Sequence, residues 1–395
     1  MNLLRFMAWI IGIGMHIVLI GRVYAIEPKP EPIVVGVLEN RTYAFAEMMR
    51  GSFNLALKKI NDRGGINGRP VKLVFADDGG EKEKGIEAVN ELVRIGKAVM
   101  LVGGYSSSNT LFMAQTAERL DIPFLVCTAA DDRISQRKKI NIFRLNPPAA
   151  EYTLGLEHLI NQGIKPASMA IVYENSPYGT SGALRMMYFC RESEIEVTAI
   201  IPYHKERAGA DYFQRIIRRL AAKPPDMIYM VSYMRDGVEL VKQIHKAGLT
   251  SLLSGGAGGF THPDFIQKAG KGAQHFLTAT LWTAEQQDML AKMYADLYRS
   301  KFGQTPDYHG AEAYSAMMVV GDVLRRTRSS KPKDLRDALL QTDLLTPFGK
   351  IAFESYGKYE RQNREMTLVL QAIGGRYHCV WPKEVALSEP ILPSK

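Results

Sequence analysis

Short apolar runs alternate with longer segments of helical period along most of the chain. Residues 33–37 form an apolar run of the kind that is buried on both faces in a parallel sheet. Apolar side chains then recur every three or four positions, which predicts a helix with one core-facing stripe made of Phe45, Met49, Phe53, Ala56 and Ile60.

The same alternation repeats in two series of similar size. The first series has expected strands at 33–37, 71–76, 98–102 and 123–127, and the second at 169–173, 197–201, 227–231 and 252–254. Strand–helix–strand units joined in this way predict parallel sheets with right-handed crossovers and helices on both faces. The pattern therefore predicts an α/β protein with two doubly wound lobes.

The last third of the chain changes character. After about residue 278 the pattern is mostly helical, and it ends in three strand-like pieces at 350–353, 366–372 and 377–381. A closing block of this kind is either a third domain or the completion of both lobes. The pattern alone leaves both interpretations open.

The N-terminus resembles a leader for export. Arg5 precedes an apolar run at 6–20, and the small-x-small pattern Val23-Tyr24-Ala25 follows, which predicts a signal peptide (1–25) cleaved after Ala25. The alternative is an uncleaved signal anchor. Other apolar runs are four to eight residues long, whereas a membrane span needs ~20, so we expect the cleaved chain not to be an integral membrane protein.

Composition and charge exclude several classes. The 395 residues are 46% hydrophobic and 23% charged, which excludes a disordered, collagenous or disulfide-scaffold protein. The formal net charge of +9 raises the question of nucleic acid, but the basic residues are scattered without interleaved aromatic side chains, so no nucleic-acid partner is expected. Three cysteines, with no C-x-x-C or Cys/His cluster, predict at least one unpaired thiol and no metal site.

Polar and aromatic residues follow several expected strands. Ligands of open parallel sheets bind at the carboxyl ends of strands. Tyr105 and Ser107 follow the strand at 98–102 and open a helix, whose free N–H groups and serine hydroxyls suit a carboxylate; simple helix capping is the alternative. In the second series Tyr178 and Tyr233 follow strands, and each offers a flat face and a hydroxyl to a small organic ligand, with packing between lobes as the alternative.

No catalytic constellation stands out in the sequence. G-x-S-x-G, H-E-x-x-H and Walker patterns are absent, and the glycines at 255–259 do not fit G-x-G-x-x-G. We therefore predict no enzymatic activity, no catalytic residues and no cofactor.

The order and spacing of several short motifs resemble a known family. These motifs are Ile60-Asn61, the run Gly64-Gly65-Ile66-Asn67-Gly68-Arg69, Asp77-Asp78, Val102-Gly103 and Tyr178-Gly179. From residue 33 to 381 the chain resembles type I periplasmic solute-binding proteins of the leucine/isoleucine/valine-binding kind, which serve ABC importers. The resemblance implies that the closing block completes both lobes rather than forming a third domain.

The family fold implies two lobes joined by a three-crossing hinge. Lobe one is expected at 26–145 and 280–345, lobe two at 146–279 and 346–385, and a C-terminal tail at 386–395. The crossings are expected near residues 143–148, 276–281 and 344–348.

The resemblance also implies ligand contacts. The lobe-one contacts fall on Ser107 and Thr128, with Ala130 where a threonine is usual, and the lobe-two aromatic contacts fall on Tyr178 and Tyr233. Ala257 stands where amino-acid binders carry the acid that pairs with the ligand's ammonium group, and the nearest substitutes are Asp131 and Asp236. We therefore expect a carboxylate ligand without an α-ammonium group, and no tight binding of branched-chain amino acids.

Three hypotheses for function follow. The first is a periplasmic solute-binding protein that captures a small organic acid or amino-acid-like ligand between its lobes and delivers it to an ABC transporter permease. The second is the ligand-sensing subunit of a membrane signalling system. The third is an enzyme on a flavodoxin-like scaffold.

Overall fold

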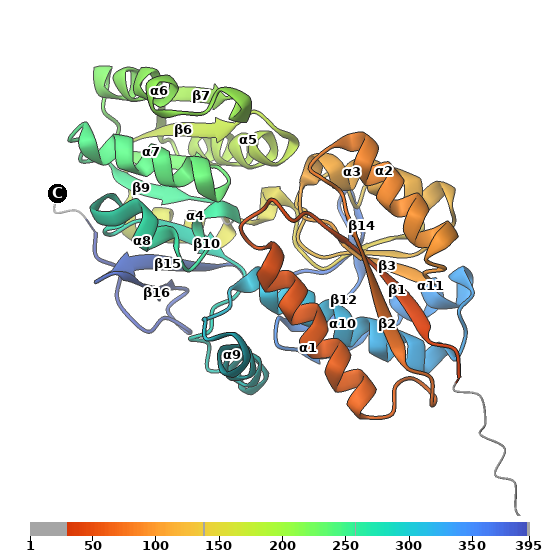
Figure 1. The fold of residues 1–395 in the computed structure, drawn as a ribbon. Coiled ribbons are helices and arrows are strands. Elements are labelled where there is room, and N and C mark those ends of the chain that lie inside the picture. Colours follow the sequence, from red (N-terminus) through yellow and green to blue (C-terminus); the bar gives the residue numbers. More distant parts are fainter. Residues whose placement is uncertain (1–29, 137–138, 257, 393–395) are drawn as a thin grey trace, which may run out of the picture. The chain divides into compact units, whose positions relative to one another are not determined.

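Two seven-stranded sheets carry the fold in the computed structural model, which describes residues 30–136, 139–256 and 258–392 (Figure 1). The first sheet has the strand order β13-β14-β5-β4-β3-β1-β2, and the second has the order β16-β15-β10-β9-β8-β6-β7. We call each sheet with its packed helices lobe one and lobe two.

The strands of the first sheet are β1 (Ile33–Glu39), β2 (Val71–Asp77), β3 (Met100–Gly103), β4 (Phe124–Val126), β5 (Ile142–Arg144), β13 (Glu354–Tyr356) and β14 (Tyr359–Gln362). Those of the second are β6 (Ser168–Glu174), β7 (Glu196–Tyr203), β8 (Met227–Val231), β9 (Leu252–Gly255), β10 (Leu277–Thr280), β15 (Leu368–Ile373) and β16 (Arg376–Trp381). A separate hairpin consists of β11 (Asp343–Thr346) and β12 (Gly349–Ala352).

Each sheet is parallel in its centre and antiparallel at one edge. In the first sheet β13 runs antiparallel to β14, and in the second sheet β15 and β16 form the antiparallel edge. The central parallel strands are almost wholly buried, as in β8, where all five residues are buried, whereas the edge strands β2 and β7 are only partly buried. Burial on both faces explains why these strands are continuous apolar runs in the sequence.

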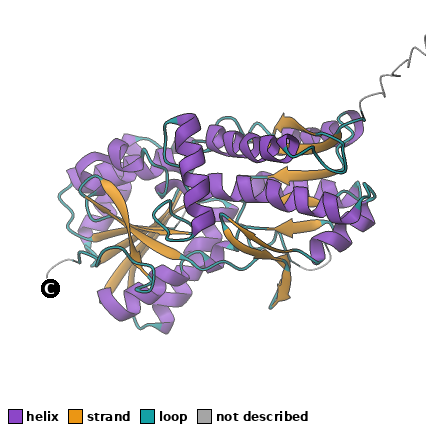
Figure 2. Ribbon diagram, turned by 90° about the horizontal axis from the view of Figure 1, so that it is seen from below, coloured by secondary structure: helices purple, strands orange, loops and turns teal. Residues whose placement is uncertain are grey.

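Helices lie on both faces of the strands (Figure 2). Lobe one has α1 (Ala46–Asp62), α2 (Lys82–Asn90), α3 (Ser107–Arg119), α9 (Met289–Phe302), α10 (Tyr308–Thr327) and α11 (Pro332–Leu340). Lobe two has α4 (Leu154–Leu159), α5 (Pro177–Glu192), α6 (Ala210–Ala222), α7 (Met234–Lys246) and α8 (Phe265–Ala269). The predicted stripe of α1 is buried at Met49, Phe53, Ala56 and Ile60, and α1 packs along α10.

The chain crosses between the sheets three times, and the third crossing differs from the expectation. The first follows β5 and the second follows β10, but the third lies between β14 and β15, at 363–367. Residues 349–362, expected in lobe two, instead form the β12 strand of the hairpin and two strands of the first sheet. The physical reason is that Gln362 pairs with Arg144 on β5 and satisfies its buried side chain.

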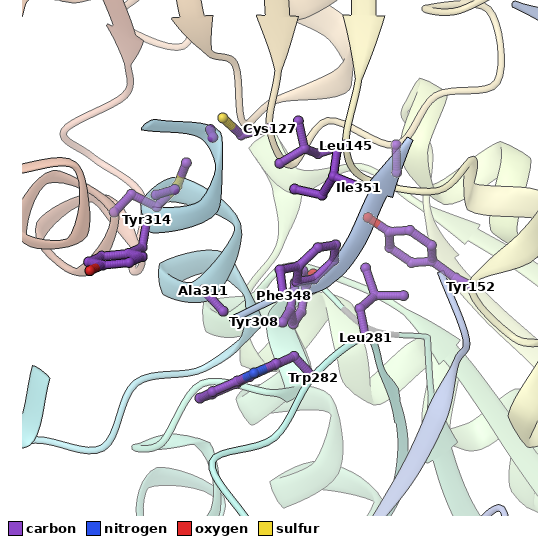
Figure 3. Packing of buried hydrophobic residues seen from close by; sticks show 14 of the residues in the cluster. Cys127, Leu145, Tyr152, Leu281, Trp282, Tyr308, Ala311, Tyr314, Phe348 and Ile351 are labelled. Atoms are coloured by element: carbon purple, nitrogen blue, oxygen red, sulfur yellow. The ribbon is translucent and has the colours of Figure 1, made fainter. Parts of the chain in front are cut away.

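The apolar core runs without a break past these crossings (Figure 3). Leu145 lies beside the first crossing, Leu281 and Trp282 follow β10, and Phe348 is in the β11–β12 hairpin; each is at most 2% exposed. They pack with Tyr308 of α10 in one cluster that also contains core residues of both lobes. The crossings are therefore packed segments and not free linkers.

Arg144 is the largest polar side chain buried beside the crossings. It is fully buried, and its guanidinium donates to Gln362 Oε1 (2.6 Å), Ser135 Oγ (2.8 Å) and the carbonyl of Asp131 (2.7 Å). Within the described part of the chain no acid forms an ion pair with it, so neutral oxygens alone satisfy the charge. Burial lowers the pKa of Arg144, but an arginine stays protonated in proteins.

We expect Gln362→Leu to destabilise the protein by about 3 kcal/mol, because it leaves part of a buried guanidinium without an acceptor. Urea unfolding measures the change. Gln341→Leu, at an exposed glutamine after α11, is the matched control and should change stability by no more than about 0.5 kcal/mol. Equal unfolding midpoints for Gln362→Leu and the parent would contradict the role of Arg144.

Candidate functional site

A cavity of about 710 Å³ lies between the two lobes, at the carboxyl ends of parallel strands. On the side of lobe one it is lined by Tyr43, which follows β1, and by Tyr105, which follows β3. On the side of lobe two it is lined by Glu174 at the end of β6 and by Tyr233, which follows β8. The cavity thus lies where the strand-end rule places ligands.

Hydrogen bonds of the Ser107 and Thr128 side chains connect the loop after β3 with the loop after β4. Ser107 opens α3, and its Oγ accepts hydrogen bonds from the N–H groups of Ala130 (3.2 Å) and Asp131 (3.0 Å). Thr128 Oγ1 donates to the carbonyl of Gly104 (3.1 Å). Because both acceptor positions of the Ser107 hydroxyl are used, its O–H is left to donate.

The first turn of α3 offers further donors. Its N-terminal N–H groups have no partners within the helix, and the side chain of Ser106 at the N-cap forms no capping bond. Ser107 and Thr128 are buried, with exposed fractions of 2% and 6%. An anion at this position would meet N–H and O–H donors at the positive end of a helix.

Tyrosine rings from both lobes meet beside these loops. Tyr43 and Tyr105 of lobe one lie 4.6 Å apart between ring centroids, and Tyr43 stacks on Tyr233 of lobe two at 5.3 Å. Tyr178, in the first turn of α5, lies 5.5 Å from Tyr233. Burial raises the pKa of Tyr105, Tyr178 and Tyr233, so their hydroxyls stay protonated and can donate.

The Tyr178 hydroxyl is buried and has no hydrogen-bond partner within the described ranges. It faces the backbone of Gly258, which has a φ of +55°, and a Cβ built there would lie only 2.2 Å from the hydroxyl oxygen. A glycine is therefore needed at this close approach. The neighbouring Ala257, which the sequence analysis places at the ammonium position, lies outside the described residues.

Both aspartates named as substitutes for an ammonium partner have an arginine beside them. Arg133 donates to both oxygens of Asp131, through Nε at 2.9 Å and Nη2 at 3.0 Å. Arg235 Nε donates to Asp236 Oδ1 at 2.8 Å. Asp236 lines the cavity, whereas the structure does not bring Asp131 to it.

Glu174, like Tyr43, is a residue of the cavity that the sequence analysis missed. It is 2% exposed, it lines the cavity, and its Oε2 has no hydrogen-bond partner in the described segments. Burial raises its pKa to about 7, while Lys205 and a hydrogen bond from Ser176 act in the opposite direction. Its place at the last position of β6 is the sequence signal that could have identified it, because ligands of parallel sheets bind at strand ends.

Other candidate chemistry is sparse in the part of the chain that the structure describes. No cluster of three or more His, Cys, Asp or Glu side chains suitable for a metal ion occurs there. Cys127, Cys190 and Cys379 are all buried free thiols. No described helix combines the length and the apolar character that crossing a membrane requires.

Comparison with known proteins places this geometry in context. A family model described as periplasmic binding protein matches residues 32–372. The Leu/Ile/Val-binding protein homolog 7 of Brucella suis is 23% identical over 369 residues, covering 88% of this chain and 90% of that protein.

Two solved structures have similar folds. A branched-chain amino acid transporter substrate binding protein from Streptococcus pneumoniae, in complex with isoleucine, has a TM-score of 0.80 at 20% identity and covers 89% of this chain and 100% of its own. An ABC transporter solute binding protein from R. palustris, in complex with benzoate, has a TM-score of 0.78 at 17% identity and covers 92% and 98%.

We expect the protein to lose stability as pH rises from about 4.5 to 7, in part because of Glu174. Its ordinary pKa is 4.5 and its pKa in the folded chain is about 7, so between these values the folded state keeps a proton that the unfolded chain releases. Glu174→Gln should remove up to about 3 kcal/mol of this loss, measured by urea unfolding at pH 5 and pH 8.

The matched control for this measurement is Glu384→Gln, at an exposed glutamate that follows β16. It should leave the difference in stability between pH 5 and pH 8 unchanged. If Glu174→Gln shows the same difference as the parent protein, the raised pKa is refuted.

Proposed function

This chain belongs to the periplasmic binding protein family, and on that premise we propose that it captures a small carboxylate between its lobes for delivery to an ABC importer. The observation that carries the proposal is that buried hydroxyl and N–H donors open α3 directly after Tyr105, whose ring packs with Tyr233 of lobe two. Ligand binding then acts by favouring a conformation in which both lobes contact the ligand.

The carboxylate is assigned to lobe one. The Ser107 hydroxyl and the first N–H groups of α3 would receive it, because they combine unpaired donors with the positive end of a helix dipole. Thr128 lies beside them, but in this structure its hydroxyl donates to the carbonyl of Gly104, so it would have to exchange that bond to contact the ligand. Burial strengthens these bonds, since a charged acceptor in a low-dielectric site interacts more strongly with its donors.

Lobe two supplies the closing side chains. Tyr178 and Tyr233 lie in one cluster with Tyr43 and Tyr105, and the Tyr178 hydroxyl has no other partner in the described chain. A ligand that inserts among these rings would gain apolar contact area and one hydroxyl donor.

Two observations favour import of an acid. The solved relatives that carry isoleucine and benzoate are described as transport proteins, and both ligands contain a carboxyl group. Their shared chemistry matches the lobe-one donors of this chain. The transport role of the relatives favours the importer hypothesis over a sensing subunit.

The cellular location and the partner follow from the family. We propose that residues 1–25, which lie outside the described residues, direct export and are removed after Ala25. The exported protein would meet a permease at the membrane surface and transfer its ligand there.

Replacing donors on either lobe should weaken binding of the carboxylate. A thermal-shift screen of small carboxylates, amino acids and amides identifies the ligand, and calorimetry then measures its affinity for Ser107→Ala and Tyr178→Phe. Each variant should lose about tenfold or more, because each removes a hydrogen bond to a charged or buried group.

Ser108→Ala and Tyr188→Phe are matched controls, since Ser108 is the next residue of α3 and Tyr188 is an exposed residue of α5. Both should bind within about twofold of the parent. If Ser107→Ala and Tyr178→Phe also retain the parent affinity, the ligand binds elsewhere.

We expect no micromolar binding of leucine, isoleucine or valine. A buried ammonium group without a carboxylate partner loses several kcal/mol of hydration, and the two nearby aspartates already bond Arg133 and Arg235. Calorimetry on protein that has been unfolded and refolded, to remove carried-over ligand, measures this. Tight binding of any of the three would overturn the expectation.

A further inference from the structure

Glu174 is a buried acid with an open hydrogen-bonding position in the wall of the cavity between the lobes. We propose that Glu174 accepts a hydrogen bond from a hydroxyl or amine at the far end of the ligand, remote from its carboxylate. The inference rests on the proposed function and adds a second recognition point that defines the ligand class.

The carboxyl group of Glu174 lies beside the start of α5. Ser176, which caps α5 by accepting from the N–H of Gly179 (3.2 Å), favours the charged form of Glu174 and so lowers its pKa. The carboxyl oxygen Oε2 has no partner among the described atoms of the protein. A buried carboxylate with a free oxygen can accept a hydrogen bond from a ligand donor.

The cations around the cavity do not occupy that oxygen. Lys205 lowers the pKa of Glu174 by its charge, yet no ion pair joins the two in the described segments. Arg235 bonds Asp236, and Lys268 bonds Asp264 at the rim. Charges on exposed side chains such as Lys205 and Lys242 are screened by solvent. The electrostatic potential next to Glu174 is therefore set mainly by its own buried carboxyl group.

Glu174 also stands apart from the other acid of the cavity. Within the described lining Asp236 is the second acid, and Arg235 already donates to it. Glu174 is therefore the acid of the described lining that has no ion-pair partner.

The position of Glu174 defines where the donor must sit on the ligand. Tyr105, Tyr233 and Glu174 line the cavity, whereas Ser107 and Thr128 do not. The proposed carboxylate donors therefore lie outside the lining of the cavity that contains Glu174. A donor that reaches Glu174 would then be remote from the carboxylate, unlike an α-hydroxyl or α-ammonium group.

Matched ligand series test the inference by calorimetry on the exported protein. One series compares 3-phenylpropanoate with 3-(4-hydroxyphenyl)propanoate and with the 2-hydroxy isomer. The other compares hexanoate with 6-hydroxyhexanoate, 6-aminohexanoate and the dicarboxylate adipate. The distal hydroxyl or amine should improve affinity about tenfold or more over the plain acid, and the 2-hydroxy isomer should not.

Variants of Glu174 assign the preference to its side chain. Glu174→Leu should abolish the gain from both distal groups and leave the affinity for the plain acid within about threefold. Glu174→Gln should abolish the gain from the amine, which needs the negative charge, and keep part of the gain from the hydroxyl. Glu384→Leu and Glu384→Gln, at an exposed glutamate that follows β16, are the matched controls and should preserve both gains.

Equal binding of plain and distally substituted acids by the parent protein overturns the inference without any variant, so a misfolded variant cannot leave it undecided. Retention of the gains in Glu174→Leu, or tightest binding of adipate, also overturns it. Loss of the proposed function has a different signature: Ser107→Ala would leave the affinity for every plain acid unchanged, or no carboxylate would bind at all.

Discussion

The buried guanidinium of Arg144 couples the last strand of lobe one to the loop that carries half of the candidate site. Its three hydrogen bonds end on Gln362, Ser135 and the Asp131 carbonyl, and none of these groups is charged. A cation removed from water must recover its hydration through such bonds, so all three acceptors are held at fixed positions. Because the N–H of Asp131 bonds Ser107, the start of α3 is held at the same time.

This coupling holds the hydrogen-bond donors of lobe one in fixed positions. The aromatic rings are then the part of the site that can adjust to the shape of a ligand. Ser107 and Thr128 are buried and bonded to backbone groups, whereas Tyr105 and Tyr233 are partly buried and contact each other across the cavity. A rigid half fixes the charged end of a ligand, and stacked rings accommodate different carbon skeletons. Such a division suits ligands that share a carboxylate and differ in their carbon skeletons.

The sequence predicts the alternating elements well, because strands buried on both faces must be apolar and helices must show a 3.6-residue period. It misplaces residues 349–362 because Glu360 and Arg361 lie within β14, so the strand does not form an apolar run. Only the three-dimensional structure, in which Gln362 pairs with Arg144, identifies β14 as a strand of the first sheet. Sequence reasoning also overlooks Glu174, because a single acid at the end of an apolar strand is usually solvated.

The two aspartates illustrate a related limit. Asp131 and Asp236 are placed near the site by their positions after strands, but each lies within two residues of an arginine. Whether such neighbours bond each other depends on side-chain rotamers, which no sequence pattern specifies. The tyrosines that follow strands in the sequence do lie near one another in the structure, and their role toward a ligand stays a prediction. Their mutual stacking emerges only in three dimensions.

The unbroken apolar cluster beside the three crossings affects the free energy of moving the lobes relative to each other. Since Trp282, Tyr308 and Phe348 pack in one cluster with core residues of both lobes, the relative motion of the lobes must shear packed side chains past one another. Ligand affinity then depends on how often the unliganded chain populates its binding-competent arrangement. Substitutions among these apolar residues would therefore change ligand affinity through the populations of the two arrangements, while the groups that contact the ligand stay the same.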